Sequence, residues 1–121
     1  MNSKVTMALR IVLAIILLVF GSNKFLGFIP MEAPPAGSFM DALIQTGYMM
    51  PLIAISEIIP GILLLFNKWK GFALAWLVPI SVNIVLFHVV FDISTIGPAA
   101  LVAILNAVLI YANWNKFKTL F

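Results

Sequence analysis

Cysteine is absent from the 121 residues, histidine occurs once, and charged residues make up only 9 % of the chain. Without cysteine there is no disulfide and no thiolate nucleophile, which excludes catalysis by thiol–disulfide exchange. The single histidine, His88, excludes a haem held by two histidines of one chain. The sequence also carries no haem, flavin or iron–sulfur motif, and we expect no metal site.

Hydrocarbon side chains fill the sequence instead. Hydrophobic residues amount to 64 %, against roughly 45–50 % in an ordinary globular domain. A soluble domain of this length cannot bury so much apolar surface, because small domains keep a large fraction of their surface exposed. The composition therefore predicts an integral membrane protein, and the length allows one domain over residues 1–121.

Four apolar segments are long enough to cross the roughly 30 Å of hydrocarbon in a bilayer. They cover residues 7–28, 48–66, 71–91 and 97–114. In the long connection after the first segment, Ser38 and Asp41 form a capping box that predicts a short interfacial helix over 38–46. Ser94 or Thr95 is the expected N-cap of the fourth segment. The links between later segments are short, so the predicted fold is all-α, an integral membrane four-helix antiparallel bundle.

Positive charge is placed on one side of this predicted bundle. Six of the seven basic residues flank the apolar segments there, namely Lys4, Arg10, Lys68, Lys70, Lys116 and Lys118. Under the positive-inside rule both termini then face the cytoplasm. The sequence pI of about 9.5 reflects this topology and contact with anionic lipid, and does not indicate nucleic acid. Arg10 lies close enough to its segment end to snorkel, and we expect the first segment to be a retained span.

Polar side chains enter the apolar segments mainly in the outer half. They are Lys24 in the first segment, Glu57 in the second, Asn83 and His88 in the third, and Asn106 in the fourth. Counted at 1.5 Å per residue, Glu57, Asn83 and Asn106 lie roughly 12–14 Å from the outer boundary. Ionisable groups at membrane depth are costly and mark functional sites. We therefore expect a polar pocket in the outer half of the bilayer.

Within this pocket Glu57 and His88 are the candidate catalytic residues, as proton donors. Glu57 either pairs with Lys24 or is kept neutral by burial, and Asp92, one turn after His88, is expected to orient or protonate the imidazole. The candidate ligand-binding residues are Lys24, Asn83 and Asn106, with Trp76 and Phe87 as aromatic walls. For the two asparagines, we favour hydrogen bonds between helices over ligand binding.

The sequence also resembles the DoxX-like family of small four-helix bacterial membrane proteins over nearly its whole length. The resemblance is carried by Arg10, by Gly-Ser-Asn-Lys-Phe at 21–25, by Ser-Glu-Ile-Ile-Pro-Gly at 56–61, and by Asn83 and His88. Where the family commonly has a second glycine beside Gly61, this chain has Pro60. The resemblance implies a multi-pass protein of the bacterial cytoplasmic (inner) membrane, associated with thiosulfate oxidation and quinone reduction.

The resemblance favours an accessory or subunit of a quinone-linked redox system. Such a chain is at most an oxidoreductase subunit that needs a bound quinone or a soluble redox partner. A non-catalytic scaffold would instead hold a partner through the small-residue face of Ala99, Ala103 and Ala107 or through the outer loop. A homodimer would use the same small-residue face. A small proton-coupled transporter would use Glu57, but small multidrug exporters carry their carboxylate in the first helix and often show weak charge bias, which disfavours that function.

Overall fold

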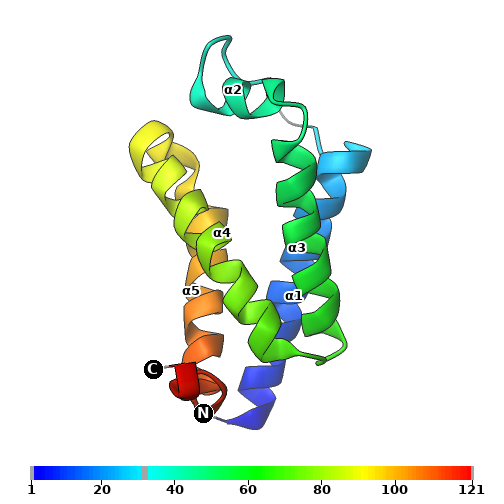
Figure 1. Cartoon of the computed structure of the whole chain (residues 1–121), viewed down its shortest axis with the longest axis vertical. Coiled ribbons are helices and arrows are strands. Elements are labelled where there is room, and N and C mark those ends of the chain that lie inside the picture. The colour runs from blue at the N-terminus through cyan, green and yellow to red at the C-terminus, as the bar shows by residue number, and fades with distance from the viewer. Residues whose placement is uncertain (1, 31–32, 121) are drawn as a thin grey trace.

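The computed structural model describes residues 2–30 and 33–120 and consists of helices and their connections (Figure 1). The long helices are α1 (Ser3–Leu26), α3 (Met49–Leu65), α4 (Lys70–Phe91) and α5 (Ile96–Ala112). The short elements are α2 (Phe39–Gln45) and three 3-10 turns, η1 (Ile93–Thr95), η2 (Trp114–Lys116) and η3 (Lys118–Leu120). The described residues contain no strand, which confirms the all-α class. Residues 31–32 of the predicted long connection lie outside the described part.

Helix length and apolar composition identify the membrane-crossing elements. Helices α1 and α4 and the segment Ile93–Ala112 are each long and apolar enough to cross a membrane. Helix α3 has 17 residues, which is roughly 25 Å at 1.5 Å per residue. It passes the same test only together with α2, from which it is bent by 92°. The chain is therefore a helical membrane protein with three such helices, or four when the bent pair is counted as one span.

The four long helices pack in a ring. Helix α1 packs on α3, α3 on α4, α4 on α5, and α5 on α1, with successive helices antiparallel (Figure 1). Both ends of the chain lie at one end of the bundle (Figure 1). We call this the basic end, because it carries the six cations that flank the helices. The opposite end, which we call the loop end, carries α2 and the connection between α4 and α5.

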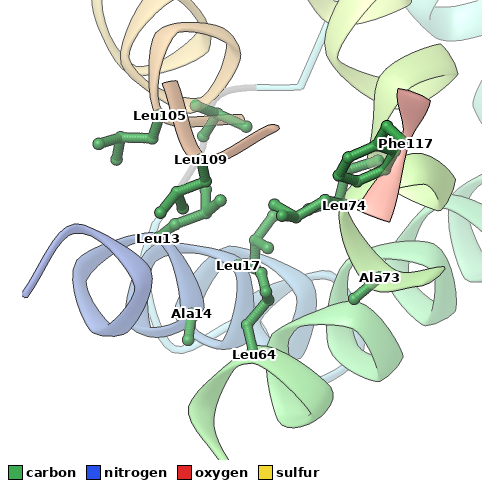
Figure 2. Close-up of a cluster of buried hydrophobic side chains, with 11 residues drawn as sticks. Leu13, Ala14, Leu17, Leu64, Ala73, Leu74, Leu105, Leu109 and Phe117 are labelled. Carbon is green, nitrogen blue, oxygen red and sulfur yellow. The ribbon is translucent and has the colours of Figure 1, made fainter. Parts of the chain in front are cut away.

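The hydrophobic core is concentrated toward the basic end. Figure 2 shows this cluster, which consists of Leu13, Ala14, Leu17, Leu64, Ala73, Leu74, Leu77, Val102, Leu105, Leu109 and Phe117. Toward the loop end the α1–α3 pair and the α4–α5 pair lean apart (Figure 1). Tyr48, Val90 and Phe91 are exposed there. The leucine core thus joins the two helix pairs at one end only.

Helix α2 begins at a capping box in which the second hydrogen bond is made one residue before the cap residue. Ser38 Oγ accepts from Asp41 N at 3.2 Å, as predicted, whereas Asp41 Oδ2 accepts from Gly37 N at 3.0 Å instead of from the cap residue. Beyond the helix, Gly47 has φ of +78°. This left-handed conformation is accessible to glycine at little cost, and it turns the chain into α3.

Aromatic rings connect α2 to α4 across the loop end. Phe39 stacks on Phe91 with ring centroids 5.2 Å apart, and lies 5.9 Å from Phe87. Phe87 and Phe91 are themselves 5.8 Å apart. Because α2 leads directly into α3, these rings link the two helix pairs where their backbones have separated.

Helices α1 and α3 approach closely at Gly21. A Cβ at this position would lie 2.8 Å from Ile58 Cγ1, 3.2 Å from the Ala54 carbonyl oxygen and 3.2 Å from Glu57 Cβ. Small residues permit such backbone approach between membrane helices. The absence of a side chain at Gly21 therefore sets the separation of α1 and α3.

Replacing Gly21 by alanine tests this contact. We expect Gly21→Ala to lower the free energy of unfolding by about 1–3 kcal/mol, because the added methyl group meets the Ile58 side chain and the Ala54 carbonyl of α3. Thermal unfolding in detergent measures the loss. Gly97→Ala is the control, since a Cβ at Gly97 meets no atom within 4 Å and alanine favours helix. Equal destabilisation of the two variants would contradict the close contact.

Candidate functional site

Lys24 and Glu57 form an ion pair between α1 and α3. Lys24 Nζ lies 2.6 Å from Glu57 Oε1, and the two side chains are 23 % and 6 % exposed. Lys24 Nζ is also 3.5 Å from the carbonyl oxygen of Phe20. Within residues 2–30 and 33–120, the buried Oε1 atom accepts no hydrogen bond, so its contact with Lys24 is an ion pair. Of the two alternatives predicted for Glu57, the structure contains the pair with Lys24.

The pair explains how a carboxylate is accommodated at the middle of α3. An isolated charge at this depth is costly, whereas an opposite charge in contact offsets much of that cost. The ammonium and carboxylate forms sum to zero charge, and so do the amine and carboxylic acid forms. A proton can therefore move between the two groups without leaving net charge in the bilayer.

Asn106 lies in a separate polar contact, between α4 and α5. Its Oδ1 accepts from Ser81 Oγ at 3.1 Å and its Nδ2 donates to the Leu74 carbonyl at 3.1 Å. Both side chains are buried. The structure thus uses Asn106 as a hydrogen-bonded link between helices, the second of the two roles considered for it.

Asn83 remains on its own helix. Its Nδ2 donates to the Pro79 carbonyl at 2.7 Å, and the residue is exposed on the outer surface of α4. A side chain hydrogen-bonded one turn back along its helix does not extend toward another helix. The structure therefore places Asn83 away from Glu57 and Lys24.

His88 lies at the loop end of α4, within hydrogen-bond distance of two oxygens. Its Nδ1 is 3.1 Å from the Asp92 carbonyl oxygen and 3.1 Å from Thr95 Oγ1. A carbonyl oxygen can only accept, so Nδ1 carries the proton. In the neutral imidazole this leaves the Nε2 lone pair available.

The expected direct contact between His88 and the Asp92 carboxylate is wrong. The carboxylate accepts from Thr95 Oγ1 at 2.6 Å and from Ser94 Oγ at 2.9 Å, so the threonine hydroxyl stands between imidazole and carboxylate. These two hydrogen bonds, that of Thr95 foremost, hold the pKa of Asp92 below its ordinary value. Thr95 is the N-cap residue of α5, but its side chain does not cap the helix.

The two predicted aromatic walls lie at different depths. Trp76 packs near Phe72, with ring centroids 5.6 Å apart, in the basic half of α4. Phe87 belongs to the ring cluster at the loop end. They are eleven positions apart in the sequence, which corresponds to roughly 16 Å along the helix axis. They do not form the walls of one site.

The predicted polar pocket is thus divided into three separate groups. The α1–α3 pair holds Lys24 and Glu57, the α4–α5 pair holds Asn106, and His88 lies at the loop end with Thr95. The division arises because each polar side chain bonds within its own helix pair or its own helix. Of these groups, the Lys24–Glu57 pair is the one that joins opposite charges, and its carboxylate is buried.

Two further residues have roles that the sequence analysis did not identify. Arg10 Nη1 donates to the carbonyls of Leu64 and, at 3.2 Å, Leu65, and so satisfies the C-terminal carbonyls of α3 instead of snorkelling. Asn23 binds the backbone of Ile29 in both directions, accepting from its N–H at 2.7 Å and donating to its carbonyl at 3.3 Å. The sequence signal for this role of Arg10 is a cation inside an apolar segment, with no acidic residue nearby to pair with it.

Apolar helices in a ring, with an ion pair between two of them, define a small polytopic helical membrane protein. The family model described as DoxX matches residues 5–90, more than half of the chain. The chain belongs to the DoxX family, which confirms the resemblance. The match includes Lys24, Glu57 and His88 and ends before α5. No curated protein and no solved structure gives a significant match.

A double-mutant cycle on Lys24 and Glu57 measures the energy of their contact. Lys24→Gln and Glu57→Gln are each expected to lower the free energy of unfolding by about 1–3 kcal/mol, because each leaves a polar partner unpaired. The double variant should lose less free energy of unfolding than the two single variants together, and the difference, the coupling energy, should be about 0.5–3 kcal/mol. Lys24→Gln combined with Asp92→Asn is the control and should be additive. Additivity in the first cycle would contradict the ion pair.

The hydrogen bonds of Asp92 predict a pH dependence of stability. Its folded pKa lies below the ordinary value of 3.8, so its stabilising contribution is present above that pH and is lost as the pH falls through the folded pKa. We expect Asp92→Asn to lack this part of the acid destabilisation. Thr95→Val, which removes the foremost hydrogen bond, should show an intermediate profile. Parallel unfolding-temperature curves from pH 7 to 2 for wild type and Asp92→Asn would exclude the effect.

Proposed function

We propose that this DoxX family member is an accessory subunit of a quinone-linked redox system in a bacterial cytoplasmic membrane. The Lys24–Glu57 pair carries the proposal, because it places a proton-exchanging group of zero net charge between two membrane helices. The orientation with the basic end in the cytoplasm is supported by the six flanking cations gathered at that end. The redox role is supported further by membership of the family.

The donors of Lys24 fit the chemistry of a quinone head group. A quinone presents two carbonyl acceptors, and the ammonium group has three N–H donors. Within residues 2–30 and 33–120, the ammonium donates to the Phe20 carbonyl and forms an ion pair with Glu57. The side chain is 23 % exposed, so it can also donate to a carbonyl arriving from the bilayer. When bound, the quinone supplies the redox chemistry, and its electrons come from a partner protein.

The residues of this chain then have distinct tasks. Lys24 binds and orients the carbonyl, while Glu57 pairs with Lys24 and can take a proton from its ammonium group without adding net charge. His88, with Nδ1 engaged, presents Nε2 at the loop end, where it is suited to exchange protons with water outside. Trp76, Phe87, Asn83 and Asn106 are not part of this site, so the bilayer and the α1–α3 surface provide its apolar surroundings.

Co-purification of quinone tests the proposal. The full chain is purified in mild detergent, and native mass spectrometry with solvent extraction measures bound quinone. We expect quinone with wild type and a reduction of about tenfold in Glu57→Gln and Lys24→Gln, because each loses a charge-assisted contact. Asp92→Asn is the matched control, since it makes the same carboxylate-to-amide change at the loop end, and it should retain quinone.

Two outcomes of this experiment would contradict the quinone site. One is the absence of quinone from folded wild-type protein extracted from membranes that contain it. The other is equal quinone content in all variants, which would mean that binding does not involve the pair. The unfolding temperature of each variant, measured in parallel, separates loss of binding from loss of fold.

A second candidate, a scaffold or homodimer, is favoured by one observation. A groove of about 520 Å³ lies along α4 and α5, and Ala103 and Ala107 are among the residues that line it. Ala99, the third residue of the predicted small-residue face, is instead buried inside the bundle. A dimer in the native mass spectrum that carries no quinone would favour this function over the first.

A further inference from the structure

A cavity of about 370 Å³ opens at the basic end, where α1, α3, α4 and α5 meet. Its polar lining consists of two cations and four uncharged groups, namely Arg10, Lys70, Ser3, Thr6, Asn67 and Asn113. Leucines of α3, α4 and α5 form its apolar side. The cavity is thus amphipathic, with positive charge at the end of the bundle and hydrocarbon toward the membrane interior.

No carboxylate neutralises these two cations within residues 2–30 and 33–120. Glu57 is occupied by Lys24, and Asp41 and Asp92 lie at the loop end, where they bind neighbouring backbone and hydroxyl groups. Concave surfaces lined by charge of one sign concentrate counter-ions, because the low-dielectric walls focus the field. The cavity is therefore suited to an anion that the chain itself does not supply.

Arg10 is held in place for such a ligand. Its Nη1 atom is bound to the carbonyls at the end of α3, which fixes the guanidinium plane. The other N–H donors of the guanidinium take no part in these bonds, and their planar fork matches the oxygens of a phosphoryl group. Lys70, from the first turn of α4, adds a second positive charge on another wall.

We infer that this cavity binds a phosphoryl anion, with Arg10 and Lys70 as its cationic ligands. The group is that of an anionic phospholipid or of a free phosphate. The apolar side of the cavity suits the glycerol and upper acyl chain of a lipid. The inference does not depend on the proposed quinone site, which uses Lys24 and Glu57 in the other half of the bundle.

Binding of defined probes to the full chain in detergent tests the inference. The probes are inorganic phosphate, dihexanoyl phosphatidylglycerol and dihexanoyl phosphatidylcholine, and the readouts are the unfolding temperature and native mass spectrometry. Saturable binding of both anions identifies the phosphoryl group as sufficient, and binding of phosphatidylglycerol alone identifies a lipid site. Binding of neither anion, or equal binding of the zwitterionic lipid, would overturn the inference.

Charge-matched variants locate the site. Lys70→Gln should weaken anion binding about tenfold, because it removes a charge-assisted contact. Lys68→Gln removes the same charge from an exposed residue of the same turn that does not line the cavity, and its affinity should stay within about twofold of wild type. Arg10→Lys, which retains the charge but not the fork, should also bind more weakly and provides a second variant. If Lys68→Gln and Lys70→Gln weakened anion binding equally, the anion would be attracted by the overall positive charge of this end and would not be bound in the cavity.

Discussion

The close contact of α1 with α3 at Gly21 is the constraint on which the candidate site depends. Because no side chain separates the helices there, Glu57 lies beside the face of α1 that also carries Lys24, one turn further along. A wider separation would leave a carboxylate in hydrocarbon without its cation, which is among the most costly arrangements in a membrane protein. At this position, the close packing of the two helices is therefore what brings the two charges into contact. The proposed function depends on the same close packing, since it needs the two groups in contact.

The two halves of the bundle are held together by different forces. Near the basic end, leucines from all four long helices interdigitate, and Arg10 joins α1 to the end of α3. Near the loop end, each helix pair has polar contacts of its own, Lys24 with Glu57 and His88 with Thr95. Hydrogen bonds between membrane helices contribute about 0.6 kcal/mol on average. The wider half of the bundle is thus specified by a few directed contacts, and the narrower half by apolar packing.

The sequence predicted the elements better than their contacts. Apolar length located the helices, and Ser38 with Asp41 located α2, because these signals are local. Depth counting placed Glu57, Asn83 and Asn106 at one level, but their partners depend on how each helix is rotated and tilted, which the count does not contain. The spacing of His88 and Asp92 implies contact only in a continuous helix. Since α4 ends at Phe91, the Asp92 backbone leaves the helical path, with φ of −156°. Its carbonyl then lies beside the imidazole, while its carboxylate is bound by Thr95.

The concentration of the core at one end also determines how the molecule can move. Separating the two helix pairs at the loop end breaks the ring contacts of Phe39 and little of the leucine cluster, so the free energy of opening is distributed unevenly along the bundle. An opening of this kind would pivot about the basic end, and displacement would grow with distance from it. Lipid chains beside the loop end would then contact a surface of changing width, while those beside the basic end would contact a constant one.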